Sequence, residues 1–369
     1  MVYNFGAGPA MLPVPVMKQI QEEFLDYNNM GVSIIEISHR SPEFTELLNE
    51  TDALFKELVK LPDNYQILYV HGGAQMQFSA IAMNFIGLKP DKKAVYYDSG
   101  NFANLAAKEA AKYGEVIIGN SSADTNYNQI PQFKADQLNE QCSYAYLTSN
   151  NTIFGTCWKE IPDTGSTPLV VDATSDILSR KMDYSKFGLL FAGAQKNLGP
   201  AGIAMVIIRE DLLGHQLEST PKLLNYQLCQ QKHSLTNTGN TFAIYTINRV
   251  LRWLKGKGGV AEIEIRNRKK ARILYEMIDD SSFYKPHSIN EHRSDMNVVF
   301  NLSEENLLQQ FLSEAKENGL YALKGHRNVG GARASIYNAM PLEGVQSLAD
   351  FMKDFERKKS QDGEFSKKS

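Results

Sequence analysis

Short apolar runs alternate with stretches of helical periodicity along most of the chain. The runs lie at residues 66–70, 94–99, 115–119, 144–148, 168–173, 188–193 and 203–209. Several are nearly continuous, as in strands that are covered on both faces. Strands separated by helices are typical of βαβ units, so the pattern predicts an α/β fold with a mostly parallel sheet flanked by helices. Sites in such sheets lie at the carboxyl ends of the strands.

The segments before the first strand have their own signals. The first fifteen residues are rich in glycine and proline and predict an extended arm, followed by a helix over 16–27. Ser41-Pro42-Glu43 combines a capping hydroxyl, a proline in the first turn and a carboxylate near the positive helix end. A helix should therefore begin there and run to Pro62.

The pattern changes after helical stretches at 241–255 and 260–279. An apolar run at 296–302, a helix near 304–318 and a glycine-rich segment at 325–341 predict a smaller α+β domain. We therefore expect an arm (1–15) packed on the small domain, a large cofactor-binding domain (16–258), the small domain (259–357) and a tail (358–369). The tail is polar and rich in lysine, which predicts disorder.

Composition excludes several classes of function. A net charge of -3 over 369 residues provides no basic field for nucleic acid or an anionic membrane. The three cysteines, Cys142, Cys157 and Cys229, form no C-x-x-C pair, and the histidines lack metal-site spacing, so neither a disulfide framework nor a metal is expected. No secretory signal or membrane-spanning run is visible, so we expect a cytoplasmic protein.

Two residues at predicted strand ends suggest chemistry. Lys196 follows an apolar strand among small residues, where burial would lower its pKa and favour the neutral amine that Schiff-base chemistry requires. Asp172 ends another strand and would suit a cationic heterocycle such as a protonated pyridine nitrogen. The alternatives are an exposed lysine in a turn and an ordinary capping aspartate.

Two further groups suggest that anions bind. Residues 71–78, HGGAQMQF, form a glycine-rich turn from a strand into a helix, which suits a phosphate at the helix start. Arginines and histidines in turn-like segments suit carboxylate or phosphate, although solvated surface cations are the usual alternative. These residues are His39, Arg40, His326, Arg327 and Arg333.

Together these segments resemble the phosphoserine aminotransferases, pyridoxal-phosphate (PLP) enzymes of fold type I. The resemblance extends to about residue 357 and rests on NFGAGPAMLP, EISHRSPEF, GGAQMQF, TSNNTIFGT, VDATSDILSR, FAGAQKNLGPAG and GHRNVGGARASIYNAMPLEGV, in the family's order. It implies a homodimer with shared active sites that transfers an amino group from glutamate to 3-phosphohydroxypyruvate in serine biosynthesis. The products would be phosphoserine and 2-oxoglutarate, and the kinetics would be ping-pong.

The resemblance also implies residue roles. Lys196 would form the internal aldimine and carry the proton, and Asp172 would pair with the pyridinium nitrogen. The other cofactor-binding residues would be Ala74, Gln75, Phe102, Thr152, Thr174 and Gln195, with Asn237 and Thr238 reaching the partner subunit's cofactor. Arg333 would bind the substrate α-carboxylate, and His39, Arg40, His326 and Arg327 would surround the distal anion.

The chain departs from the family pattern at a few positions. Phe102 stands where a tryptophan is usual, Gln75 where some members have arginine, and Gly239-Asn240 where Pro-Pro is common. The alternatives that stay open are an alanine–glyoxylate type of aminotransferase and a non-catalytic cofactor-binding protein. A side activity on phosphorylated hydroxythreonine in pyridoxine biosynthesis, which the family implies in some bacteria, also stays open.

Overall fold

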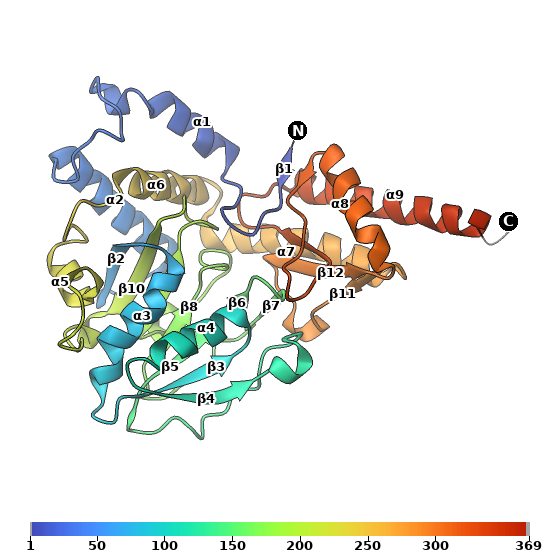
Figure 1. Ribbon diagram of the computed structural model, residues 1–369. Coiled ribbons are helices and arrows are strands. Elements are labelled where there is room, and N and C mark those ends of the chain that lie inside the picture. Colours follow the sequence, from blue (N-terminus) through green and yellow to red (C-terminus); the bar gives the residue numbers. More distant parts are fainter. Residues whose placement is uncertain (1, 367–369) are drawn as a thin grey trace.

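A seven-stranded sheet forms the centre of the large domain (Figure 1). The computed structural model describes residues 2–366, with side chains to residue 361. The strand order is β2-β10-β9-β8-β5-β3-β4. The strands are β2 (Tyr65–His71), β3 (Lys93–Asp98), β4 (Glu115–Ser121), β5 (Cys142–Thr148), β8 (Leu169–Asp172), β9 (Leu189–Gly193) and β10 (Ile203–Arg209). These are the apolar runs that the sequence predicts as strands. The expected α/β fold is thus confirmed.

One strand breaks the parallel order of this sheet. Strand β10 pairs antiparallel with both β2 and β9, while β9, β8, β5, β3 and β4 run parallel to one another. The carboxyl ends of the other strands therefore share one edge with the amino end of β10. Gly202, which precedes β10, consequently lies at the same edge as Asp172.

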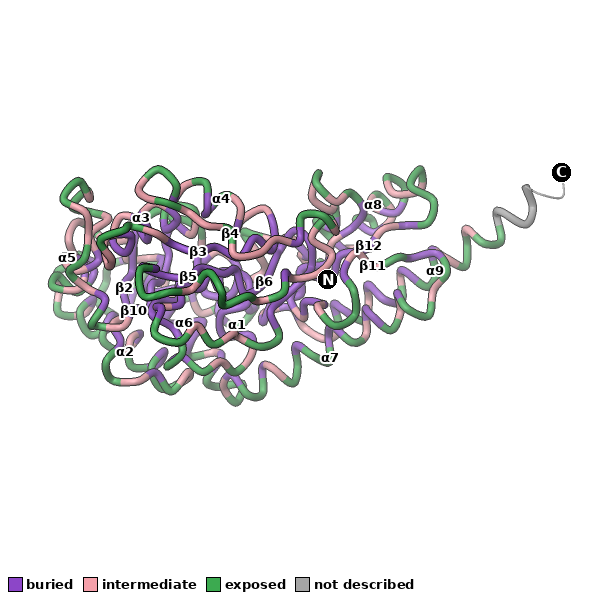
Figure 2. The backbone as a smooth tube through the Cα atoms, turned by 90° about the horizontal axis from the view of Figure 1, so that it is seen from below, coloured by how far each residue is buried: buried purple, intermediate pink, exposed green. Residues whose placement is uncertain are grey.

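Helices cover both faces of the sheet. Successive side chains of each strand point to opposite sides, so each face packs in a buried cluster of its own. Ile67 and Tyr69 of β2 pack in one buried cluster with α2 (Pro42–Val59) and α6 (Thr241–Gly256). Leu68 and Val70 pack in another with α3 (Ala74–Phe85), α4 (Asn101–Ala110) and α5 (Tyr226–Gln231). Figure 2 shows most of these strands as buried backbone inside the large domain.

The first helices differ slightly from the prediction. Helix α1 spans Val14–Glu23 and starts earlier than expected, with a proline in its first turn. Helix α2 begins as predicted, since the Ser41 hydroxyl accepts a hydrogen bond from Phe44 N at 3.2 Å. It ends at Val59, where Lys60 takes a left-handed conformation.

The small domain is built around an antiparallel sheet of β11 (Tyr284–Pro286), β12 (Asn297–Leu302) and β14 (Ala332–Ser335). Helices α7 (Gly259–Asp279), α8 (Leu308–Glu317) and α9 (Leu342–Ser366) pack against it. The arm joins this domain, because β1 (Tyr3–Asn4) pairs in parallel with β13 (Leu320–Tyr321).

The remaining elements are short. A small hairpin joins β6 (Asn150–Asn151) and β7 (Thr156–Cys157). The 3-10 helices are Tyr27–Asn29, Ile86–Leu88, Ala123–Thr125, Tyr184–Lys186, Glu210–Leu212, Lys222–Leu224, Asn290–His292 and Glu305–Leu307.

Helix α9 continues where a disordered tail was expected. It runs to Ser366, through most of the segment 358–369, and projects from the small domain (Figure 1). Lys358, Lys359 and Gln361 favour helix and the segment has no proline, so nothing ends the helix at residue 358. Residues 367–369 of the expected tail lie outside the described residues. No helix in the described part of the chain is long and apolar enough to cross a membrane.

Candidate active site

A cavity of about 520 Å³ opens at the sheet edge where the parallel strands end. The segments that follow β2, β5, β8 and β9 meet there with the arm and with β14 of the small domain. Its lining residues are Ala7, Gly8, Pro9, Gly72, Gly73, Ala74, Gln75, Phe78, Phe102, Thr148, Asn150, Thr152, Ile153, Asp172, Thr174, Ser175, Gln195, Lys196, Ala201, Gly202, His326 and Arg333.

Lys196 presents its amine to this cavity from the loop after β9. Its Nζ is buried and donates to the Thr152 hydroxyl at 2.6 Å. Nζ also lies 5.7 Å from the centre of the Phe102 ring. Burial lowers the pKa of Lys196 to about 8, and the positive charge of Arg333 acts in the same direction. The amine is therefore far more often neutral at physiological pH than an exposed lysine would be.

The lowered pKa predicts how the protein should react with an added aromatic aldehyde. Only the neutral amine attacks a carbonyl, so the rate should rise with pH and level off above about 8. An ordinary lysine would give a rate that still climbs toward a pKa of about 10.4. Stopped-flow absorbance across this pH range measures the rate, and a midpoint near 10 would contradict the burial of Lys196.

Asp172 lines the same cavity from the last position of β8. It is buried, and its Oδ1 accepts a hydrogen bond from Thr174 N at 2.9 Å. Burial raises the pKa of Asp172, while Thr174 and the charge of Lys196 oppose the rise. A buried carboxylate of this kind is stabilised by a cationic partner in the cavity.

The start of helix α3 provides a site for an anion. Gly72 and Gly73 both have positive φ, and α3 begins at Ala74 without a capping side chain among the described residues. A Cβ on Gly193 would lie 2.6 Å from Gln195 Oε1 and 3.1 Å from Ala74 N. Glycine is therefore needed for β9 to approach this helix start, whose backbone N–H groups suit a phosphate.

The small domain contributes a cation, Arg333, and a histidine, His326, to the cavity. Arg333 on β14 is partly buried, and its Nη1 donates to the Thr152 carbonyl at 3.4 Å. Arg333 Nε is buried without a hydrogen-bond partner in the described chain, as is Thr148 Oγ1. The pKa of His326 is lowered by burial and by the charges of Arg333 and Arg327. These polar atoms leave room for further hydrogen bonds to a bound anion.

The structure brings together most of the residues that the sequence singles out. The lining includes Ala74, Gln75, Phe102, Thr152, Asp172, Thr174, Gln195, Lys196, His326 and Arg333. Five others lie outside the lining of the chain's own cavity, namely His39, Arg40, Asn237, Thr238 and Arg327. Arg40 is exposed and donates from Nε to His39 Nε2 at 3.2 Å, and Asn237 Oδ1 lies 3.0 Å from His71 Nε2.

Sequence reasoning missed the contribution of the arm. Ala7, Gly8 and Pro9 line the cavity, and Ala10 N donates to the Gln195 carbonyl at 2.9 Å. A Cβ on Gly8 would lie 3.4 Å from Lys196 Cγ. The glycines of the arm signalled a turn, but no local pattern predicts that it meets the lysine loop. Thr148 was predictable, because it ends an apolar run as Asp172 does.

The chain matches the family model described as aminotransferase class V over residues 2–348. The chain belongs to the class-V aminotransferases. Phosphoserine aminotransferase of Lysinibacillus sphaericus is 48% identical over 357 residues, which cover 96% of this chain and 98% of the relative. Within the class, this aminotransferase falls in the phosphoserine aminotransferase family, and the predicted resemblance is confirmed.

Solved structures agree with this assignment. The phosphoserine aminotransferase of Bacillus circulans subsp. alkalophilus has a TM-score of 0.94 at 44% identity, over 97% of this chain and 99% of the other. The PLP-bound phosphoserine aminotransferase of Trichomonas vaginalis has a TM-score of 0.91 at 35% identity, over 96% and 100%. This class-V aminotransferase therefore has the expected fold type I architecture, and its family implies PLP as cofactor.

Proposed function

We propose that the chain transfers the amino group of glutamate to 3-phosphohydroxypyruvate, giving phosphoserine and 2-oxoglutarate, with PLP held at Lys196. The observation that carries this proposal is the arrangement of charges in the cavity. A lysine with a lowered pKa shares the cavity with a buried carboxylate, Asp172, with the cation Arg333 and with His326. The carboxylate suits a cationic ring, and Arg333 and the N–H of His326 suit an anionic substrate.

The residues present fit PLP. When bound, PLP would supply an electron sink for the electrons released at the substrate Cα. Asp172 would pair with the ring nitrogen, Phe102 would lie against the ring, and Thr152 would contact the ring hydroxyl region, with Thr174 supporting the site. The phosphate would lie at the start of α3, held by the amides of Ala74 and Gln75 and by Gln195, where a Cβ on Gly193 would fill the space.

Lys196 would hold and move the proton during the reaction. A larger fraction of its amine is neutral at physiological pH than in an exposed lysine, and this neutral form can accept a proton from the substrate Cα and return it. Thr152 fixes the position of Nζ through the bond of 2.6 Å. Because Thr152 also accepts a hydrogen bond from Arg333 through its carbonyl, the residue links the reactive amine to the substrate cation.

The cations would select the substrate. Arg333 would bind the α-carboxylate, for which its planar fork is suited. Glutamate and phosphoserine each carry a second anion, which the cations Arg327 and Arg40 and the side chains of His326 and His39 would hold. One pocket would thus serve both halves of a ping-pong reaction.

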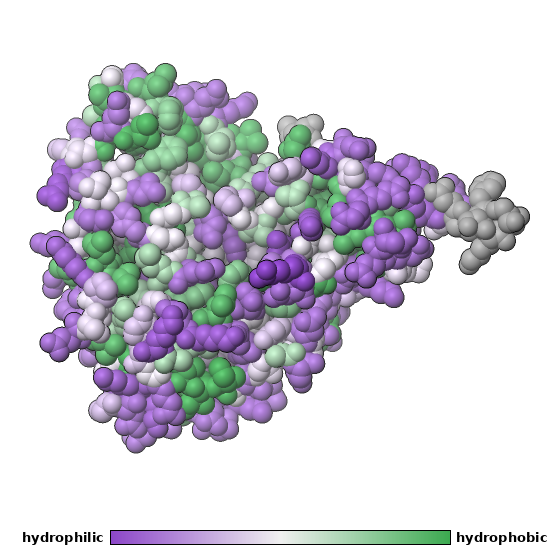
Figure 3. All heavy atoms as spheres, in the orientation of Figure 1, coloured by the Kyte–Doolittle hydropathy of each residue, from purple (hydrophilic) through white to green (hydrophobic). Residues whose placement is uncertain are grey.

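A second copy of the chain would complete the site. His39 and Arg40 lie outside the chain's own cavity, and an apolar surface lies in the same part of the chain. Its exposed residues are Val14, Met17, Phe24, Leu25, Met30, Val32 and Ile35. Figure 3 shows apolar atoms gathered over the region of α1. The opposite side of α1 is fixed, since Arg249 Nη2 lies 2.8 Å from Glu23 Oε2. We infer that this surface packs against a second copy, which presents Arg40 and Asn237 to its partner's cavity.

Complementation between inactive variants tests this arrangement. Lys196→Ala and Arg40→Met chains should each have little activity as pure proteins. Co-expressed, they should recover roughly a quarter of the unaltered activity, because about half of the dimers are mixed and each has one complete site. If isolated mixed dimers show no activity, Arg40 acts in the cavity of its own chain.

The activity itself is tested with purified protein and added PLP. Glutamate-dependent conversion of 3-phosphohydroxypyruvate should be observed, and alanine should be a poor amino donor because it lacks the second anion. Absence of turnover with glutamate would sink the proposal, and a preference for alanine would favour an alanine–glyoxylate type of enzyme.

A further inference from the structure

The turn that follows Asp172 is held by asparagine side chains from three different elements. Asn197 belongs to the lysine loop, Asn338 follows β14, and Asn267 lies on α7. Their amide groups bond consecutive carbonyls of the turn: Asn197 Nδ2 donates to Ile177 O at 3.0 Å, Asn338 Nδ2 to Leu178 O at 3.0 Å, and Asn267 Nδ2 to Ser179 O at 2.9 Å. We call Asn197, Asn338 and Asn267 the asparagine clasp.

The members of the clasp are also bonded to one another. Asn338 N donates to Asn197 Oδ1 at 3.0 Å, and Asn267 Nδ2 donates to Asn338 Oδ1 at 2.8 Å. All three side chains are nearly fully buried. A carboxamide both donates and accepts, so each can bond a turn carbonyl and a neighbouring member at once. Asn338 is the central member, because it bonds both of the others.

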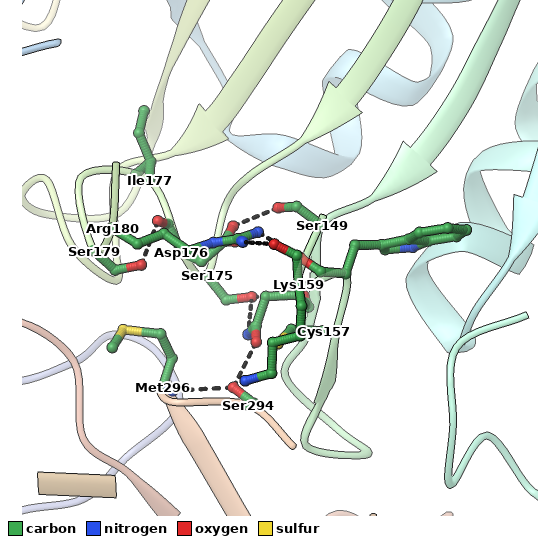
Figure 4. A network of polar contacts seen from close by, with 12 residues as sticks. Ser149, Cys157, Lys159, Ser175, Asp176, Ile177, Ser179, Arg180, Ser294 and Met296 are labelled. Carbon is green, nitrogen blue, oxygen red and sulfur yellow. Dashed lines mark hydrogen bonds and ion pairs between the residues drawn. The ribbon is translucent and has the colours of Figure 1, made fainter. Parts of the chain in front are cut away.

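The turn needs this support. Leu178 has a φ of +58°, a conformation that a bulky side chain rarely adopts, and it persists only where surrounding contacts enforce it. The opposite side of the turn is anchored through Asp176, whose carboxylate bonds the Ser149 hydroxyl and lies 3.4 Å from Arg180 Nη2 (Figure 4). The turn follows directly on Asp172, so a shift of the turn would move the Asp172 carboxylate in the cavity.

The clasp connects the two domains at the residues next to the reactive groups. Asn197 directly follows Lys196, and Asn338 lies five residues after Arg333 on the same segment. This segment is also held to α7, because Lys270 Nζ donates to the carbonyls of Ile336, Tyr337 and Met340 at 2.9, 2.7 and 3.1 Å. Two hydrogen bonds therefore join the segment of the substrate arginine to the large domain beside the lysine. The backbone N–H of Asn338 bonds the Asn197 side chain, and the Asn338 side chain bonds the turn at Leu178 O.

We propose that Asn338 is a positioning residue that sets the separation between Arg333 in the small domain and Lys196 in the large domain. The inference rests on the proposed function, in which Arg333 binds the α-carboxylate of the substrate. A substrate whose carboxylate is fixed by Arg333 presents its Cα to Lys196 only if the two elements keep their spacing. A misplacement of about 1 Å can cost about 100-fold in rate.

The test compares Asn338→Ala with a matched variant, Asn84→Ala. Asn84 is also a buried asparagine with a set of hydrogen bonds, to Ala80 O and Leu224 O and from Tyr226 N, but all of them lie within the large domain. Both variants should lower the thermal unfolding temperature. Only Asn338→Ala should lower kcat/KM for glutamate and phosphoserine, by about ten- to 100-fold, with PLP affinity within about twofold of the unaltered protein.

Asn267→Ala serves as a milder second variant, since it leaves the bond from Asn338 Nδ2 to Leu178 O in place. It should shift kcat/KM in the same direction by a smaller factor, and it keeps the inference testable if Asn338→Ala does not fold. Equal kcat/KM values in the clasp variants and Asn84→Ala would overturn the inference while the proposed function stands. Absence of turnover by the unaltered protein would overturn the proposed function and this inference with it.

Discussion

Replacing Lys196 by alanine should abolish transamination, with turnover lowered by at least about 10⁴-fold. Lys196 is the lysine that the described cavity lining contains, and its buried amine bonds Thr152. Without it, no group at this place can hold the cofactor covalently or return a proton to the substrate. The cavity would still bind PLP through the start of α3 and Asp172, so cofactor affinity should fall much less than turnover.

A matched lysine controls for nonspecific effects. Lys316 lies exposed on α8, and Lys316→Ala should leave turnover and the absorption spectrum unchanged. The measurements are single-turnover kinetics with glutamate and equilibrium titration with PLP. Residual turnover within about 100-fold of the unaltered protein would show that another group moves the proton.

Replacing Arg333 by methionine should lower kcat/KM for both amino donors by about 100- to 1000-fold. A bidentate, charge-assisted pair with a carboxylate provides roughly 3–4 kcal/mol, and methionine removes it with little change in packing volume. Arg333→Lys keeps the charge but loses the planar fork, so its kcat/KM should lie between those of the unaltered protein and Arg333→Met. Because Arg333 lies on β14, away from the start of α3, PLP affinity should stay within a few-fold.

An exposed arginine provides the control for this series. Arg272 lies on α7 with an exposed side chain, and Arg272→Met should leave kcat/KM unchanged. Steady-state kinetics with glutamate and with phosphoserine measure the effect on both halves of the reaction. A loss confined to one donor would contradict binding of the α-carboxylate by Arg333, because both donors carry that group.

The strands and the central site residues were predictable from local sequence. Apolar runs report burial, and a polar residue that ends such a run, as Asp172 does, lies at the edge where the site forms. Lys196 was predictable for the same reason. The direction of β10 was not, because an apolar run looks the same in a parallel and an antiparallel strand.

Contacts between distant segments account for what the sequence could not predict. The arm reaches the lysine loop through Ala10 and Gln195, and Asn338 reaches Asn197 across the domain boundary. Neither contact leaves a periodic signal, since each depends on where two loops meet in space. The placement of Arg40 outside its own cavity is likewise a property of the assembled fold.

The most direct test of the central claim is the absorption spectrum of PLP-loaded protein before and after addition of phosphoserine, with alanine as the control. The account predicts a visible band from lysine-bound cofactor that phosphoserine removes within one half-reaction and that alanine leaves largely unchanged. A visible band that phosphoserine does not alter would contradict the claim that this cavity transfers an amino group from a doubly anionic substrate.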